Sequence, residues 1–473
     1  MSELARLTAV DLESLYRAKK LSPVEVARDA MARIDAVEPA INAFIVRDGA
    51  VTLAMAQASE ARWQAGHPLG PLDGVPITIK DNLVVSGWPT RRGSALASDA
   101  PATEDAPAVA RMREAGAVFL GKTTMPEYGW KGVGDSPLTG ATRNPWDLAM
   151  TPGGSSAGAA AAAALNLGCL HLGTDGAGSV RIPAAFCGVV GFKPTYGHVP
   201  AWPVSTMGFL AHIGPLTATV RDAALAMNAI GRPDARDMTA TLRPIVDFVA
   251  GLAEGVRGLR IAYSPRLGFD VAVDPEVAAL SEAAARVFEE LGAIVERADP
   301  GFGDPIAPLT TLWSAGAALA LATVSKADRC RMDPGLVAVA EAGERVSGAE
   351  YVDALLFQRN ALAHRMAQFH QRYDLLITPA LAVPAFEANR LTPAHGRYGE
   401  VWTNWTPFSY PFNLTQQPAV SIPSGLTKAG LPAGLQIVGA FGADALVLRA
   451  AAAFEAVRPF ARLDAPRSKM TSA

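Results

Sequence analysis

The sequence carries little charge and no basic run. Only 18% of the 473 residues are charged, and the formal net charge is −3. A surface that binds the phosphates of nucleic acid needs a strong excess of lysine and arginine. The isolated pair Arg91-Arg92 is interpreted as ordinary surface charge. The composition therefore argues against nucleic acid as a main partner.

Cysteine and histidine are also scarce. The three cysteines, Cys169, Cys187 and Cys330, are widely spaced and form no CxxC pair. This pattern argues against a disulfide framework or a zinc site, and we interpret all three as reduced core thiols of a cytoplasmic protein. The seven histidines show no HxxxH or HExxH spacing. The sequence thus predicts no metal and no cofactor.

Long apolar runs are absent as well. The longest weakly polar stretch, residues 157–173, is mostly alanine and glycine and is interrupted by Asn166 and His171. It is too short and too weakly apolar to span a bilayer. The first 20 residues are charged and amphipathic, unlike a signal peptide. We therefore expect a soluble protein without a membrane partner.

Hydrophobic residues make up 50% of the chain, so it can bury a large core. Residues 75–79 and 117–120 are short apolar runs typical of buried strands, whereas residues 106–115 and 157–167 have the length and composition of helices. The second half of the chain alternates in the same way. This alternation predicts a layered α/β fold.

The chain contains no low-complexity linker and no internal repeat, so we predict one large domain spanning residues 1–473. Residues 1–65 form a helical N-terminal segment in this prediction. Its clearest start signal is Ser22-Pro23 followed by Glu25, a helix cap with proline at the first position. Residues 66–225 hold the chemically informative motifs, and residues 226–473 complete the domain.

Three segments combine reactive side chains with small residues. Lys80 ends an apolar strand, where a lysine is either a surface cap or a buried functional amine. Ser155 and Ser156 lie in the glycine-rich segment 152–158, where serine is also a common helix cap. The third segment, 173–179, reads GTDGAGS, and its small residues allow successive backbone N–H groups to point at one oxyanion. Each segment alone also has an ordinary structural explanation.

Together the three segments suggest a serine nucleophile. Such a nucleophile needs a base and an oxyanion hole. No histidine lies near either serine motif together with a carboxylate placed to support it; His171 and His198 are the nearest. A lysine can replace histidine as the base if burial lowers its pKa enough to keep it neutral. Lys80, between Ile79 and Asp81, is the candidate.

This combination resembles the amidase signature family. The resemblance continues weakly to the C-terminus and so covers nearly the whole chain. It implies an α/β/α layered domain with a mixed central sheet covered by helices. The matching motifs are residues 74–82 (GVPITIKDN), 140–146 (GATRNPW), 153–156 (GGSS), 174–184 (TDGAGSVRIPA) and 191–195 (GFKPT).

The resemblance implies a catalytic triad. Ser179 would attack the carbonyl carbon, Ser155 would follow a cis peptide bond and relay the proton, and Lys80 would be the base. Ser156 would brace Lys80. The same matched motifs would supply the oxyanion hole from the backbone N–H groups of Gly176, Ala177, Gly178 and Ser179, and supporting residues at Thr174, Asp175 and Arg181.

Two positions depart from the family pattern. Many members have glycine where this chain has Ala157 and Ala177. Alanine is also small, so we expect both turns to be kept. A backbone with positive φ at Ala177 would, however, strain its methyl group.

A competing motif points to another class of protein. Residues 116–123, GAVFLGKT, fit the phosphate-binding pattern GxxxxGK[ST]. In a true P-loop the residues between the glycines form an exposed loop, whereas Ala117–Leu120 have the character of a strand. Pro126 also disfavours the helix that should follow. A nucleotide-binding module dependent on Lys122, or a catalytically silent scaffold, remains the alternative from another class.

The aromatic residues suggest the substrate. If part of this set lines one pocket, the substrate is a small apolar or aryl carboxamide, or a related anilide, hydrazide or ester. The alternative within the family is the glutamine-hydrolysing subunit of a tRNA-dependent amidotransferase, which would need partner subunits. Family habit also suggests a homodimer. The pocket candidates are Tyr128, Trp130, Trp202, Phe209 and Trp313, with Trp402 and Trp405 as further members of the aromatic set.

Overall fold

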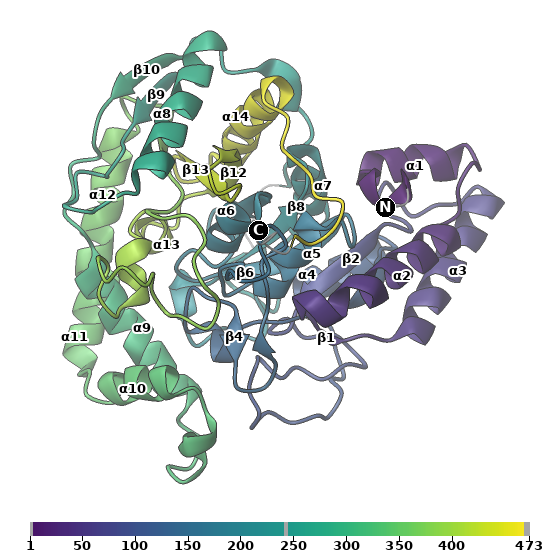
Figure 1. Cartoon of the computed structure of the whole chain (residues 1–473), viewed down its shortest axis with the longest axis horizontal. Coiled ribbons are helices and arrows are strands. Elements are labelled where there is room, and N and C mark those ends of the chain that lie inside the picture. Colours follow the sequence, from purple (N-terminus) through teal and green to yellow (C-terminus); the bar gives the residue numbers. More distant parts are fainter. Residues whose placement is uncertain (1–2, 241–244, 468–473) are drawn as a thin grey trace, which may run out of the picture.

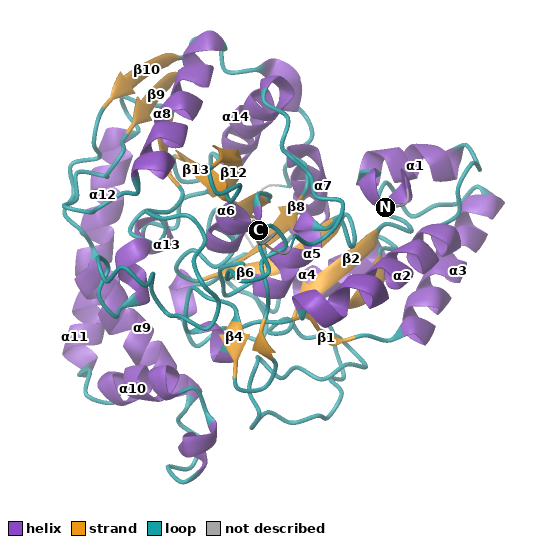
Figure 2. Cartoon of the chain, in the orientation of Figure 1, coloured by secondary structure: helices purple, strands orange, loops and turns teal. Residues whose placement is uncertain are grey.

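The computed structural model describes residues 3–240 and 245–467. Its centre is a mixed sheet flanked by helices, which confirms the predicted α/β fold class (Figures 1 and 2). In spatial order its strands are β1 (Phe44–Val46), β3 (Val118–Thr123), β2 (Pro76–Lys80), β6 (Leu170–Asp175), β8 (His212–Thr217), β7 (Val190–Lys193), β12 (Ala419–Leu426), β13 (Pro432–Gly439), β11 (Leu375–Pro379), β9 (Arg260–Tyr263) and β10 (Ile294–Arg297).

Both kinds of strand pairing occur in this sheet. β2 lies parallel to β3 and β6, and β9 lies parallel to β10 and β11. The strands between these two groups pair antiparallel. Strands from all three predicted segments join the sheet, and β1 places one strand inside the segment expected to be helical. A separate short antiparallel pair, β4 (Asp135–Ser136) and β5 (Gly140–Ala141), lies outside this sheet.

The helices cover both faces of the sheet. They are α1 (Ala9–Arg17), α2 (Pro23–Ile41), α3 (Gly49–Ala65), α4 (Pro107–Glu114), α5 (Ala157–Ala164), α6 (Arg181–Cys187), α7 (Val220–Ile230), α8 (Pro275–Glu290), α9 (Ile306–Ala320), α10 (Pro334–Gly343), α11 (Gly348–Val352), α12 (Arg359–Phe369), α13 (Pro411–Leu414) and α14 (Asp444–Val457). In Figure 1, α1–α3 gather at one end of the molecule and α9–α12 at the other.

The start of α2 follows the sequence signal. Ser22 Oγ accepts from the backbone N–H of Val24 and Glu25, and the Glu25 carboxylate accepts from the Ser22 N–H at 2.8 Å. This reciprocal capping box satisfies N–H groups that the first helical turn leaves free.

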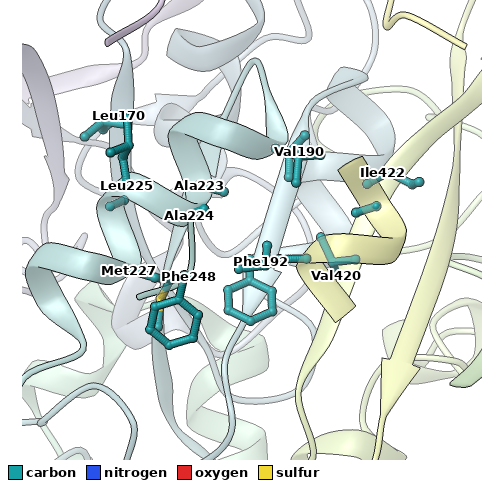
Figure 3. Packing of buried hydrophobic residues seen from close by; sticks show 14 of the residues in the cluster. Leu170, Val190, Phe192, Ala223, Ala224, Leu225, Met227, Phe248, Val420 and Ile422 are labelled. Carbon is teal, nitrogen blue, oxygen red and sulfur yellow. The ribbon is translucent and has the colours of Figure 1, made fainter. Parts of the chain in front are cut away.

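The core on one face of the sheet joins α4, α7, α8 and α14 to alternate residues of the strands. Figure 3 shows part of it, where Val190 and Phe192 of β7 lie near Val420 and Ile422 of β12. On β2, Ile77 and Ile79 belong to the same core. Because successive side chains of a strand point to opposite faces, this arrangement directs Lys80 to the other face, where α5 and α6 pack.

Three features of the described residues bear on the expectations drawn from composition. Cys169 and Cys187 are buried free thiols, but Cys330 is exposed, so the interpretation of all three as core residues is wrong. Among the residues that the structure describes, no helix is long and apolar enough to cross a membrane. Across the same residues, no group of histidine, cysteine, aspartate or glutamate is arranged to hold a metal ion.

Candidate active site

Lys80 is a fully buried amine at the end of β2. Its Nζ lies 2.8 Å from Ser155 Oγ and 2.8 Å from Thr174 Oγ1, with the Thr174 carbonyl oxygen at 3.4 Å. Burial lowers the pKa of Lys80 from 10.5 to about 7, and the negative charge of Asp175 limits the shift. A substantial fraction of this amine is therefore neutral near neutral pH.

The three contacts of Lys80 match the bonding capacity of a neutral amine. The Thr174 carbonyl can only accept a hydrogen bond, and Thr174 Oγ1 also accepts one from Asn82 Nδ2 at 3.0 Å. These two oxygens can accept hydrogen bonds from the two N–H groups of the neutral amine. The nitrogen lone pair is then left for the hydroxyl of Ser155, which is the direction that proton abstraction requires.

Ser155 follows a cis peptide bond from Gly154. Gly154 packs so closely on the neighbouring chain that a Cβ there would lie 2.5 Å from the Val133 carbonyl oxygen, so a residue with a side chain does not fit. Ser156, expected to brace Lys80, forms no hydrogen bond with it among the described residues. Its Oγ instead donates to the Thr174 carbonyl at 3.2 Å and accepts from the Thr174 N–H at 3.3 Å. Ser156 thus acts on Lys80 through Thr174.

Ser179 lies at the end of the glycine-rich turn after β6, and its side chain lines the same cavity as Ser155. The two hydroxyls do not form a hydrogen bond: Ser155 Oγ is bound by Lys80, and Ser179 Oγ has no partner within the described chain. The Ser179 hydroxyl is therefore free to approach a bound carbonyl group.

One of the four expected oxyanion donors is already occupied. The Gly178 N–H donates to Asp175 Oδ1 at 2.7 Å, so it is unavailable to a substrate oxygen. For Gly176, Ala177 and Ser179, no partner of the backbone N–H is found within the described residues. The left-handed φ in this turn, +120°, falls on Gly178 and not on Ala177, so the methyl group of Ala177 is accommodated without backbone strain.

Asp175 and Arg181 hold this turn in place. Arg181 binds both Asp175 carboxylate oxygens at 2.9 Å, and both side chains are buried. Burial alone would raise the pKa of Asp175, but the Arg181 guanidinium brings it below its usual range. The remaining donors of Arg181 are satisfied by the Ser409 carbonyl, Gln436 and Asn413. The carboxylate therefore stays charged and fixes the N–H groups of Gly178 and Val180.

The two serines open onto a cavity of about 280 Å³. Tyr128, Trp202 and Trp313 line it, as does the segment 203–207 (Pro-Val-Ser-Thr-Met). Two of the predicted pocket residues lie elsewhere. Trp130 is buried in the hydrophobic core, whereas Phe209 is 42% exposed and packs beside Tyr196. Of the other aromatic candidates, Trp402 is buried against Trp313, and Trp405 stacks on Phe186.

Three lining residues with nitrogen-bearing side chains were not among the predicted site residues. Asn82 belongs to the matched motif GVPITIKDN, which was a usable signal. Arg92 was interpreted as surface charge. His212 of β8 had no motif around it; its Nδ1 lies 2.8 Å from the Leu210 carbonyl and therefore carries the proton. Burial lowers the pKa of His212 well below its usual value, so the ring is neutral.

The remaining sequence candidates lie outside the cavity. His171 is fully buried on β6, where its ring bonds to Thr78 and burial lowers its pKa to about 3. His198 pairs with Asp444. The GxxxxGKT residues are not a phosphate loop, because Val118–Thr123 form the buried strand β3. Lys122 is bound by Asp81 and by the Pro89 carbonyl. Its side chain is fully buried, so a nucleotide phosphate cannot reach it.

Two serine hydroxyls line one cavity, and a buried amine is hydrogen-bonded to one of them; these are the groups that hydrolysis through a serine nucleophile requires. The Amidase family profile matches residues 25–448, and the chain belongs to this family, the one that its motifs resemble. It is an amidase, a hydrolase that acts on amide C–N bonds.

Known relatives extend over the whole fold. The chain is 41% identical to an acylamidase of Rhodococcus erythropolis over 96% of both chains. It is 36% identical to one of the subunits of the glutamyl-tRNA(Gln) amidotransferase of Myxococcus xanthus, over 98% of this chain and 100% of that one. A solved bacterial aryl acylamidase of the amidase signature family superposes with a TM-score of 0.90 at 32% identity, covering 97% of each chain.

Proposed function

We propose that the enzyme hydrolyses aryl or alkyl amides through an acyl-enzyme on Ser179. Ser179 Oγ attacks the carbonyl carbon and passes its proton to Ser155, whose own proton moves to Lys80. The free N–H groups of Gly176, Ala177 and Ser179 stabilise the oxyanion. Collapse of the intermediate breaks the C–N bond, and Ser155 returns a proton to the leaving amine. Water then attacks the ester of the acyl-enzyme through the same proton transfers and frees Ser179. The contact of 2.8 Å between Lys80 Nζ and Ser155 Oγ carries this proposal.

The cavity wall supports an apolar acyl group over glutamine. Trp313 lies against the oxyanion turn, since a Cβ on Gly176 would come 3.1 Å from its ring. Trp202, Leu319 and Ala320 extend the apolar surface. Glutamine carries an α-ammonium group that a carboxylate should bind, and none of the described residues lining the cavity is aspartate or glutamate.

A substrate panel tests this proposal. Amine release is measured from benzanilide, acetanilide, an aliphatic amide, a hydrazide and glutamine under identical conditions. We expect kcat/KM for the anilides to exceed that for glutamine by at least about 100-fold, because glutamine would bury an unpaired ammonium group. A preference for glutamine, or activity that requires a co-purified partner, would favour the amidotransferase alternative.

The pH dependence of kcat/KM tests the role of Lys80. With a pKa of about 7, Lys80 is protonated and inactive at lower pH and neutral at higher pH. We expect log kcat/KM for an anilide to rise with a slope near 1 below pH 7 and to level off above about pH 8. A viscosity-independent rate would establish that chemistry is rate-limiting. A flat profile between pH 6 and 9 under that condition contradicts the assignment.

Three further expectations belong to this proposal. The enzyme works in the cytoplasm on a small-molecule amide, binds no nucleic acid and forms a homodimer. Cell fractionation tests the first of these, and electrophoretic mobility shift of RNA and DNA tests the second. Light scattering at several protein concentrations tests the third, because a dimer gives twice the chain mass of 49.3 kDa.

A further inference from the structure

Arg92 is a positive charge at the edge of the cavity without a counter-charge. Its side chain is exposed and lines the cavity beside Asn82 and Tyr128. Across residues 3–240 and 245–467, its guanidinium has no ion pair and no hydrogen-bond partner. His212 is neutral, so among the described lining residues Arg92 alone carries a full charge near neutral pH.

The backbone holds Arg92 in this position. Arg92 has a left-handed φ of 53°, a conformation that residues other than glycine rarely adopt, and its carbonyl accepts from the Tyr128 N–H at 2.8 Å. The N–H groups of Arg91 and Gly93 donate to the buried carboxylate of Asp81 at 3.4 and 3.2 Å. Asp81 directly follows Lys80, so the loop that presents Arg92 is anchored to the strand that presents the base.

The position of Ser155 indicates which half of an amide faces Arg92. Ser155 protonates the leaving amine in the proposed mechanism, so the amine half lies on its side. Gly129 borders Ser155 directly, since a Cβ on Gly129 would come 3.1 Å from Ser155 Oγ. The preceding residue, Tyr128, donates its N–H to the Arg92 carbonyl. The oxyanion turn borders Trp313 instead. The amine half therefore points to Arg92 and the acyl half to the apolar wall.

We propose that Arg92 selects amides whose amine half carries a carboxylate, with an apolar or aryl acyl half. This inference rests on the proposed function, because it uses Ser155 as the proton donor to the leaving group. A guanidinium matches a carboxylate with two parallel hydrogen bonds, and no acidic side chain lining the cavity in the described residues competes for it.

Two isomeric probes test the inference. In 4-(benzoylamino)benzoate the carboxylate is on the amine half, in 4-(phenylcarbamoyl)benzoate it is on the acyl half, and benzanilide is the neutral reference. We expect the ratio of kcat/KM for 4-(benzoylamino)benzoate to that for benzanilide to fall roughly 10- to 100-fold in Arg92→Met. Arg92→Lys should recover part of the loss.

The matched control is Arg91→Met. Arg91 is the neighbouring arginine, its guanidinium pairs with Asp99, and it is not among the lining residues. It should keep the wild-type ratio. An unchanged ratio in Arg92→Met overturns the inference, and so does a fall confined to 4-(phenylcarbamoyl)benzoate.

A binding measurement separates this inference from the proposed function. If the wild type hydrolyses none of the three amides, the proposed function is contradicted. Calorimetric binding of 4-(benzoylamino)benzoate to the Ser179→Ala variant, with and without Arg92→Met, then decides the role of Arg92. A Kd that Arg92→Met raises by roughly 10- to 100-fold upholds the role of Arg92. The same Kd with and without Arg92→Met overturns it.

Discussion

Replacement of Ser179 by alanine should reduce kcat for an anilide on the order of 10⁴-fold or more, because the variant has no atom to form the acyl-enzyme. The cavity and the oxyanion turn should persist, since Ser179 Oγ has no partner among the described residues. Substrate binding should therefore change far less than kcat. Amine release under saturating substrate measures the loss, and mass spectrometry of quenched wild-type enzyme should find the acyl group on the peptide containing Ser179.

Ser424→Ala is a suitable control for this variant. Ser424 lies on β12, and its hydroxyl donates to the Ala433 carbonyl at 3.0 Å. It is not among the residues that line the cavity at Ser155 and Ser179. It should retain wild-type kcat. An acyl group found on Ser155 instead of Ser179 would show that Ser155 is the nucleophile. Full activity of Ser179→Ala would exclude Ser179 as the nucleophile.

The central part of the site could be predicted because its residues lie in local motifs. Lys80 is the last residue of the five-residue strand β2, whose alternation fixes the face to which its side chain points, and Ser155 and Ser179 lie in short glycine-rich turns. Such features depend on neighbouring residues in the chain. The mixed sheet was expected from the family resemblance, and three of the five matched motifs contain residues of the strands β2, β6 and β7.

The remaining features depend on contacts between distant parts of the chain. The Gly178 N–H is lost to the oxyanion hole because Asp175 takes it, and Asp175 is held there by Arg181 and also by Asn413, 238 residues away. Trp130 was expected at the cavity as one of the set of aromatic residues, yet it packs into the core beside α10: a Cβ on Gly335 would touch its ring. Composition alone does not distinguish an aromatic residue at a cavity from one in a core.

The pair Asp175–Arg181 provides the largest expected effect on stability. Arg181→Met leaves the carboxylate of Asp175 charged and buried without its main partner, and removal of one member of a buried pair costs about 3–5 kcal/mol. We expect that loss in the free energy of urea unfolding, followed by circular dichroism. Arg181→Met should also lower kcat, because the carboxylate that fixes the Gly178 N–H loses its own support.

Two comparisons isolate this effect. In Arg181→Met/Asp175→Asn the buried charge is gone, so part of the stability should return while the turn remains poorly fixed. Arg286→Met removes an exposed helical pair with Glu282 and should cost less than about 1 kcal/mol. If Arg181→Met were as stable as Arg286→Met, the Asp175–Arg181 pair would contribute no more stability than a surface ion pair. The oxyanion turn would then be held by the hydrogen bonds of Asn413 and Ser409 alone. Loss of activity without loss of stability would assign Arg181 to positioning of the turn.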